Sequence, residues 1–307
     1  MKVLTVATRS GDLAVAQTRV VTDALKKIYP DLQIKVRKIT TRGDRDRRTA
    51  LWNLRTSGFF TSKVEDALLT KEADFAVHSF KDLPTLHREG LTVAAVCGRE
   101  FTEDCLIALN PVTSIDQLQP SAKIGTSSLR RTAQIKHLRP ALQPTDIRGN
   151  VPTRIRKLHE GKFDAVILAR AGIERLGLTD KISFCFDPRQ FIPAPAQGAL
   201  AVQTRADDVP TGELIAAIDD EKARTATLAE RRVLSKMQCG CHAPAGAFAE
   251  IIGDDIAIYA FISDLEGKNF IRRHITGPVA DAKNLAEQLA NQLLNAGGTN
   301  ILENLES

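Results

Sequence analysis

The sequence contains few aromatic residues and no long apolar run. Phe, Trp and Tyr make up 5% of its 307 residues, with a single Trp and two Tyr. Proteins that hold single-stranded nucleic acid commonly stack the bases on aromatic side chains, so this composition argues against that function. No apolar stretch approaches the roughly 18 residues of a membrane-spanning helix. We therefore expect neither a nucleic acid nor a membrane as a partner.

The five cysteines are odd in number and show no paired spacing of a disulfide framework. A reducing compartment is the simpler interpretation. The apolar run at residues 3–7 is short and ends at a charge, which is typical of a strand and not of the core of a signal peptide. We therefore expect the protein to act in the cytoplasm.

Positive charge is in moderate excess, with 42 Lys and Arg against 37 Asp and Glu and a net charge of +5. This balance argues weakly for an anionic partner. The basic residues are interspersed with acidic ones and do not gather into a stripe, which is a further argument against nucleic-acid binding.

Two parts of the sequence repeat the same order of elements. A β-rich apolar run at residues 3–7 is followed by a polar turn, and then by apolar residues at helical spacing that stop before Pro30. A second copy opens at residues 122–131. Each copy is followed by a charged amphipathic helix and a further apolar strand, at residues 73–78 and 162–168. We interpret the chain as an internal duplication of α/β units.

Strands that alternate with helices favour sheets covered on both faces, with ligands bound beyond the strand ends. The predicted fold class is therefore α/β, with two lobes like those of periplasmic binding proteins around a hinged cleft. From about residue 222 the pattern changes to one long helix, strand-like runs and a final helix at residues 285–294. This part is predicted to be a smaller C-terminal α+β domain.

The turn at residues 125–128 lies between a predicted strand and a predicted helix. Its hydroxyls, including those of Thr126 and Ser128, and its free backbone N–H groups are placed to cap the helix and to hold an anion. The turn at residues 8–11 repeats the arrangement. Plain N-capping without a ligand is the alternative interpretation, and the arginines directly downstream favour the anion site.

Arginine recurs around these turns. A guanidinium presents a fork of donors matched to carboxylate or phosphate, and a buried set of them needs anions for compensation. Ligand contacts concentrate at turns and helix starts, where four arginines are predicted to lie: Arg130, Arg131, Arg148 and Arg154. Solvated helix faces explain four other basic residues equally well: Arg139, Arg156, Lys157 and Arg175.

Asp82 comes just after the strand predicted at residues 73–78, in a loop that Pro84 stiffens. A carboxylate at the mouth of the expected cleft can stabilise a cationic intermediate and pass protons. An ordinary turn pair with Lys81 is the alternative interpretation.

Cys241 stands in the run Cys239-Gly240-Cys241-His242. This run lacks the second ligand pair of a structural zinc site, so we expect no metal. A buried cysteine that acts as a small hydrophobe is a better alternative. The glycines and the proline around Cys241 indicate an exposed turn, which favours an accessible thiol.

Several ordered motifs resemble those of the hydroxymethylbilane synthase family, also called porphobilinogen deaminases, over nearly the whole chain. The motifs are Ala7-Thr8-Arg9, Thr41-Arg42-Gly43-Asp44, His78-Ser79-Phe80-Lys81-Asp82-Leu83-Pro84, Gly125-Thr126-Ser127-Ser128-Leu129-Arg130-Arg131, Arg148-Gly149-Asn150-Val151, Gln197-Gly198-Ala199 and Gly240-Cys241. The resemblance implies a transferase of tetrapyrrole (haem) biosynthesis. Such an enzyme condenses four porphobilinogen molecules head to tail with release of ammonia, and then frees the linear 1-hydroxymethylbilane by hydrolysis.

The resemblance also implies a dipyrromethane cofactor, itself made from porphobilinogen and held by a thioether to Cys241. Each pyrrole brings an acetate and a propionate, which gives the arginine surplus a chemical reason. Asp82 would be catalytic, because it would hydrogen-bond pyrrole N–H groups and stabilise the azafulvenium cation left when ammonia departs. The residues implied in cofactor binding, besides Cys241, are Ser79, Lys81, Thr126, Ser128, Arg130, Arg131, Arg148 and Arg154. The residues implied in substrate binding are Arg9, Arg148, Gln197 and Arg175.

In the resembling family the chain crosses from lobe one to lobe two and later returns, so lobe one would be discontinuous. The implied domains are residues 1–98 with 199–216 for lobe one, 103–192 for lobe two, and 221–307 for the C-terminal domain that carries the cofactor cysteine. Hinge closure between the lobes would be the expected motion. A monomer is the family expectation.

The segment at residues 51–60 departs from the family, which usually has a glycine- and lysine-rich stretch there. Asn53 and Ser57 stand where two lysines are common, and Gly11 stands where a serine is common. The segment resembles a mobile lid, in which Arg55 substitutes in part for the missing charge. We expect weaker substrate binding than in a typical member.

Other functions fit parts of the pattern. A solute receptor of the periplasmic type or the effector lobe of a regulator would share the duplicated halves and the cleft, but would need no thiol at residue 241. No signal segment supports the first of these, and no helix-turn-helix pattern supports the second. The altered lid segment suggests an inactive paralogue that binds tetrapyrrole precursors.

Overall fold

The computed structural model describes residues 3–40, 61–85, 88–238 and 243–306. Within these ranges the chain folds as two compact units. Unit 1 takes in residues up to 100 together with 197–224, and unit 2 takes in residues 101–196 and 225–306.

Unit 1 is built on a five-stranded mixed sheet. Its strands are β1 (Val3–Arg9), β2 (Gln33–Ile39), β3 (Phe75–Ser79), β4 (Leu91–Cys97) and β10 (Leu200–Arg205), and its helices include α1 (Asp12–Ile28), α3 (Ser62–Leu69) and α7 (Val209–Ala216). The order across the sheet is β2-β1-β3-β10-β4. β1 runs parallel to β2 and β3, whereas β10 runs antiparallel to β3 and β4. A strand from a distant part of the sequence therefore lies inside this sheet.

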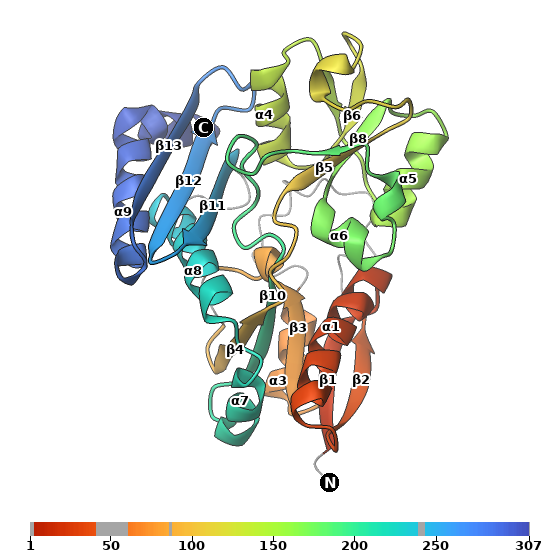
Figure 1. Cartoon of the computed structure of the whole chain (residues 1–307), viewed down its shortest axis with the longest axis vertical. Coiled ribbons are helices and arrows are strands. Elements are labelled where there is room, and N and C mark those ends of the chain that lie inside the picture. Colours follow the sequence, from red (N-terminus) through yellow and green to blue (C-terminus); the bar gives the residue numbers. More distant parts are fainter. Residues whose placement is uncertain (1–2, 41–60, 86–87, 239–242, 307) are drawn as a thin grey trace. The chain divides into compact units, whose positions relative to one another are not determined.

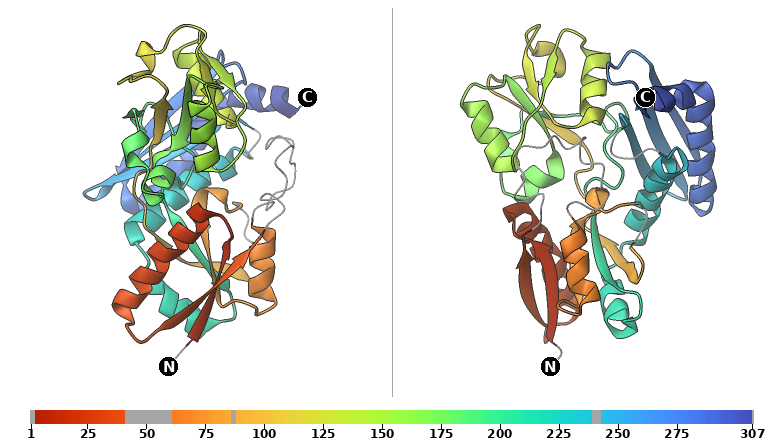
Figure 2. Two further views of the ribbon diagram at one scale, coloured as in Figure 1. Left: turned by 90° about the vertical axis from the view of Figure 1, so that its right-hand side faces the viewer. Right: turned by 180° about the vertical axis from the view of Figure 1, so that it is seen from behind.

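The strands of unit 1 lie between two helices, α1 and α3, as Figure 2 shows. Successive side chains of a strand point to opposite faces of its sheet. Phe75 and Val77 of β3 accordingly pack with Leu25 of α1, whereas Ala76 between them packs with Leu68 of α3. Burial on both faces explains why the first residues of β3 form a continuous apolar run in the sequence.

Unit 2 repeats this arrangement in its first part. The strands are β5 (Asp104–Ala108), β6 (Lys123–Gly125), β7 (Gln143–Thr145), β8 (Ala165–Ala169) and β9 (Phe184–Cys185), and the helices α4 (Leu129–Leu138), α5 (Val151–His159) and α6 (Arg170–Arg175). The order is β7-β6-β8-β5-β9, with β6 parallel to its neighbours and β5 antiparallel to β8 and β9. In both sheets three parallel strands are followed by an antiparallel strand and an edge strand. The predicted duplication of α/β units is confirmed.

The last part of unit 2 is a three-stranded antiparallel sheet with helices packed on it (Figure 1). Its elements are α8 (Glu221–Lys236), whose first residues up to 224 belong to unit 1, β11 (Ala245–Ile252), β12 (Asp255–Ser263), β13 (Phe270–Pro278), α9 (Ala282–Leu293), the kinked turn Leu294–Gly298 and α10 (Thr299–Glu306). Val233 of α8 and Leu289 of α9 share one buried cluster with Ile258 of β12. The predicted smaller α+β part is confirmed, while the three-domain boundaries and the hinge stay predictions.

None of the helices in the described ranges is long and apolar enough to cross a lipid bilayer.

The prediction of side-chain caps is confirmed at one of the two turns. Ser128 is the N-cap of α4, and its Oγ accepts a hydrogen bond from the N–H of Arg131 at 3.4 Å. At the first turn the prediction is wrong, because the N-cap of α1 is Gly11, which has no side chain to accept a bond. The hydroxyl of Thr8 donates instead to the carbonyl of Ala14.

The hairpin between β12 and β13 packs against α4 within unit 2. Lys136 of α4 pairs with Glu266 at 2.7 Å, and the ring of His137 stacks on Phe270 with 4.0 Å between centroids. Gly267 sits at the tip with φ of +69°, and a Cβ there would lie 2.4 Å from the carbonyl oxygen of Ala133. Glycine is therefore required at this close approach of two backbones.

We predict that Gly267→Ala lowers the free energy of unfolding by about 1–3 kcal/mol more than Gly253→Ala does, because the new methyl group overlaps the backbone of α4. Gly253 is the matched control, since its φ is +64° and nothing lies within 4 Å of an added Cβ. Urea unfolding followed by circular dichroism checks this. Equal losses in the two variants would contradict a tight hairpin contact.

Candidate anion-binding site

The start of α4 forms a turn that hydrogen bonds fix from several sides. The backbone N–H of Thr126 donates to the carbonyl of Thr145, and its Oγ1 accepts from the N–H of Ser128 at 3.2 Å. The hydroxyl of Ser127 donates to the carbonyl of Ile147 and accepts from the N–H of the same residue. The sequence thus places small hydroxyl residues where they close the turn between strand and helix.

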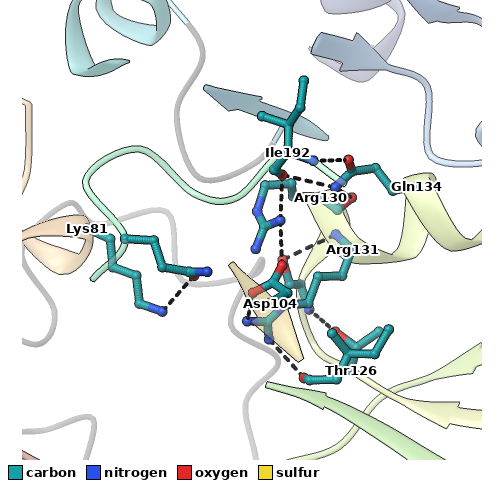
Figure 3. Close-up of polar contacts among 10 residues, drawn as sticks. Lys81, Asp104, Thr126, Arg130, Arg131, Gln134 and Ile192 are labelled. Atoms are coloured by element: carbon teal, nitrogen blue, oxygen red, sulfur yellow. Dashed lines mark hydrogen bonds and ion pairs between the residues drawn. The ribbon is translucent and has the colours of Figure 1, made fainter. Parts of the chain in front are cut away.

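Asp104 lies between the guanidiniums of Arg130 and Arg131, as Figure 3 shows. Its Oδ2 is 2.9 Å from Nη1 of Arg130, and its Oδ1 is 2.7 Å from Nη2 of Arg131. The carboxylate is 0% exposed, and each arginine is 7% exposed. Arg130 also donates to the carbonyl of Ile192 at 2.8 Å, and Arg131 to that of Ile167 at 3.0 Å. Both predicted arginines are therefore buried, side by side and bonded to one internal anion.

Burial by itself would raise the pKa of Asp104, but the two guanidiniums hold that pKa well below its ordinary value. The arginines need this partner for a second reason. They lie in the first turn of α4, where the helix dipole disfavours positive charge. Asp104 was not predicted from the sequence. The available signal was an acidic residue directly before the apolar strand residues Cys105 and Leu106.

Positive charge extends from Arg131 toward Arg148 and Arg154. Arg154 stands in the first turn of α5 and donates from Nε to the carbonyl of Gly149 at 2.8 Å. Burial, together with the positive charges of Arg131 and Arg148, lowers the pKa of Arg154 to about 10, and the negative charge of Asp146 opposes the shift. Six predicted cofactor residues are thus gathered on the ends of neighbouring elements of one unit: Thr126, Ser128, Arg130, Arg131, Arg148 and Arg154.

Four of the other predicted site residues lie together in unit 1, at the ends of β3 and β10. Nζ of Lys81 donates to Oε1 of Gln197 at 3.1 Å, and Oγ of Ser79 accepts from Nε2 of Gln17 at 2.7 Å. Gln197 is buried, whereas Asp82 is exposed at the end of a 3₁₀ turn, Phe80–Asp82. Phe80 anchors this turn in the core, which leaves the Asp82 carboxylate accessible.

Arg9 ends β1 beside a buried histidine. Burial lowers the pKa of His78 to about 4, and the positive charge of Arg9 contributes to the shift. His78 is therefore a neutral imidazole near pH 7. His78 lies in the same motif as Asp82, and the family resemblance implied no role for it.

The remaining predictions have different outcomes. Arg156 is exposed and pairs with Glu160 one turn later, which confirms a solvated helix face. Arg139 donates to the carbonyls of Ile115 and Leu118 and has a structural role. Arg175 is half-buried at the end of α6, and its role in substrate binding stays a prediction. Cys241 and the segment at residues 51–60, with Asn53, Arg55 and Ser57, lie outside the described residues.

The cluster in unit 2 fits a ligand that carries carboxylates. Within the described ranges, Nε of Arg131 is a buried donor without a hydrogen-bond partner. A buried donor left unpaired costs free energy, and a ligand anion that accepts from it would remove that cost. Besides burial, the positive charges of Arg131 and Arg148 lower the pKa of Arg154, so these guanidiniums lie close enough to act on one ligand anion. The residues present are thus suited to an anionic cofactor with several carboxylates.

These features define a class of protein: a duplicated α/β chain whose second sheet presents a buried, arginine-rich cluster suited to carboxylates. Comparisons with known proteins narrow the class. The family model described as "Porphobilinogen deaminase, dipyromethane cofactor binding domain" matches residues 4–213, and "Porphobilinogen deaminase, C-terminal domain" matches residues 224–295. The chain belongs to the porphobilinogen deaminase family.

Curated relatives agree over nearly the full length. Porphobilinogen deaminase of Roseiflexus castenholzii is 41% identical over 299 residues, which cover 97% of this chain and 98% of that protein. Porphobilinogen deaminase of Natranaerobius thermophilus is 40% identical over 308 residues, which cover 99% of each. The family predicted from the motifs is confirmed.

Two binding proteins are among the solved structures to which this chain is similar. The methionine binding protein MetQ covers 70% of this chain and 89% of its own, with a TM-score of 0.45 and 12% identity. The periplasmic aliphatic sulphonate binding protein SsuA from Escherichia coli covers 78% of this chain and 71% of its own, with a TM-score of 0.41 and 15% identity.

We predict that the stability of unit 1 decreases as the pH falls from about 6.5 to about 4, with His78 contributing about 3 kcal/mol over this range. The sign follows from the pKa. In the folded chain it is about 4, below the ordinary 6.5, so the unfolded chain takes up the proton first as pH falls.

Urea unfolding at several pH values, compared with His78→Gln, isolates this contribution because glutamine does not titrate. The variant should lose less stability than the parent between pH 6.5 and pH 4. Parallel curves for the two proteins would contradict a neutral, buried His78.

Proposed function

We propose that this chain is a transferase that condenses four porphobilinogen molecules head to tail and hydrolyses the product to 1-hydroxymethylbilane in tetrapyrrole biosynthesis. A covalent dipyrromethane on Cys241 would supply the primer on which the chain grows. The observation that carries the proposal is the buried guanidinium pair of Arg130 and Arg131, in a chain that belongs to the porphobilinogen deaminase family.

The proposed role of the unit 2 cluster is to hold carboxylates. Each pyrrole of a dipyrromethane bears an acetate and a propionate, so every unit added brings two negative charges. Guanidiniums bind such groups through paired hydrogen bonds, and they do so more strongly where the local dielectric is low. Arg130, Arg131, Arg148 and Arg154 would neutralise these charges, and the hydroxyls of Thr126 and Ser128 would add neutral hydrogen bonds.

The proposed catalytic residue is Asp82. Its exposed carboxylate can accept hydrogen bonds from pyrrole N–H groups, and it supplies negative charge where positive charge develops as ammonia leaves the substrate. Lys81 and Ser79 beside it would orient ligand carboxylates. The residues proposed to bind incoming substrate are Arg9, Arg148, Gln197 and Arg175.

The proposal includes a monomer that acts in the cytoplasm, with porphobilinogen as its partner and with neither nucleic acid nor a membrane. Within the described ranges Cys105 and Cys185 are free thiols. Cys105 and Cys185 lie opposite each other on β5 and β9 and remain thiols, as in a reducing compartment. Light scattering coupled to gel filtration checks the monomer.

We predict that the purified protein carries an added mass equal to two linked pyrrole units, and that Cys241→Ser lacks it, because the thioether needs this sulfur. Intact-mass spectrometry of both proteins tests this. Cys185→Ser is a control that should keep the adduct, since Cys185 is also a free thiol. If the parent stays unmodified after incubation with porphobilinogen, the proposal is refuted, and the chain is better explained as a protein that only binds an anion.

We predict that Asp82→Ala lowers turnover roughly 100-fold or more, the usual range for loss of a positioned acid or base, while urea unfolding is unchanged because Asp82 is exposed. The matched control is Asp180→Ala, since Asp180 is an exposed residue of another 3₁₀ turn, Thr179–Lys181. Product formation by both variants is compared with the parent. Normal turnover in Asp82→Ala would refute the catalytic assignment.

A further inference from the structure

Asp104 lies outside every motif that carries the family resemblance, yet its buried carboxylate contacts both arginines at the start of α4. We infer that Asp104 is a positioning residue for carboxylate binding: it fixes Arg130 and Arg131 together and leaves Nε of Arg131 for the ligand. The inference rests on the proposed function, since it concerns how the same site holds its anions.

Adjacent residues of an α-helix are about 100° apart around its axis, so Arg130 and Arg131 would ordinarily point in different directions. Asp104 brings them together, because each of its two oxygens takes one guanidinium, at 2.9 Å and 2.7 Å. Figure 3 shows the carboxylate between the two side chains. The distance between the two cations is thus set by the width of one carboxylate.

Each guanidinium is also held at a second point. Arg130 donates to the carbonyl of Ile192, and Arg131 donates to the carbonyl of Ile167 in β8. Gln134, one turn further along α4, bonds both polar groups of Ile192: its Nε2 donates to the carbonyl at 3.1 Å, and its Oε1 accepts from the N–H at 2.7 Å. The carbonyl that orients Arg130 is therefore fixed by the same helix.

These contacts leave a defined capacity for a ligand. One negative and two positive charges leave a single net positive charge on Asp104, Arg130 and Arg131. Among the residues that the structure describes, Nε of Arg131 has no acceptor and is buried. One ligand carboxylate would neutralise the remaining positive charge and accept a hydrogen bond from the remaining donor. No further anion would then have to be buried at the site.

A simpler role for Asp104 would be charge neutralisation alone. Asp104→Glu separates the two roles, because it keeps the charge but moves the carboxylate by one methylene. Neutralisation alone predicts a variant that loads its cofactor like the parent. Positioning predicts a folded variant with impaired loading, since both guanidiniums shift with the carboxylate.

The experiment compares Asp104→Glu and Asp104→Asn with Asp208→Asn. The control also removes a carboxylate from a buried arginine, Arg205, but in unit 1, and asparagine retains the helix-capping function of Asp208. Intact mass gives the fraction of protein that carries dipyrromethane, and urea unfolding gives stability. Steady-state kinetics on the loaded fraction separates KM from kcat.

We expect a reduced loaded fraction in both Asp104 variants and a KM for porphobilinogen raised roughly tenfold, the effect of one misplaced charge-assisted hydrogen bond, with kcat changed much less. Asp208→Asn should load fully and keep the parent KM. Parent-like loading and KM in folded Asp104→Glu would overturn the inference, as would failure of both Asp104 variants to fold while Asp208→Asn folds. A parent without adduct would overturn the proposed function instead.

Discussion

Burial of two like charges side by side is the constraint on which the second sheet depends. An ion removed from water costs several kcal/mol unless its surroundings compensate it. Here the compensation comes from Asp104 at the start of β5, from the carbonyl of Ile167 in β8 and from the carbonyl of Ile192. Because these groups come from separate parts of the chain, the arginines are accommodated only when the sheet around them is assembled.

Helix α4 connects this charged site to the C-terminal sheet. Its first turn carries the arginines, its middle holds Ile192 through Gln134, and its last turn contacts the hairpin at Gly267 and Phe270. Contacts along the whole helix therefore orient the residues at its start. A binding site whose side chains are held before the ligand arrives loses less entropy when it binds.

Local patterns in the sequence predicted most of the helices and strands, because the spacing of apolar residues and the residues that favour turns act over only a few positions. The strand and helix around residues 123–138 are an example, and so is the cap at Ser128. The predicted side-chain cap of α1 failed because the position just before the helix is Gly11, not one of the hydroxyl residues earlier in the turn.

The arginines of the site followed from motifs, but their internal anion did not. Asp104 and Arg130 are 26 positions apart and meet only because β5 pairs with β8 in the sheet. A periodic pattern over a few positions cannot predict this contact between distant residues. An acidic residue at the start of a strand is, moreover, usually exposed to solvent. The role of Gln134 could not be predicted either, because a glutamine inside a helix does not indicate a hydrogen bond to the backbone of Ile192.

The position of β10 has a consequence for how the chain acquires its structure. β10 lies between β3 and β4, although more than 100 residues separate it from either strand in the sequence. A ribosome that has released only the first half of the chain has produced a sheet split at its centre, with β3 and β4 each lacking a hydrogen-bonding neighbour. Closure of so long a loop is entropically costly and slow. Unit 1 therefore cannot reach its native structure until the chain has been synthesised as far as residue 205. Until then the unpaired edges of β3 and β4 can associate with the wrong strands.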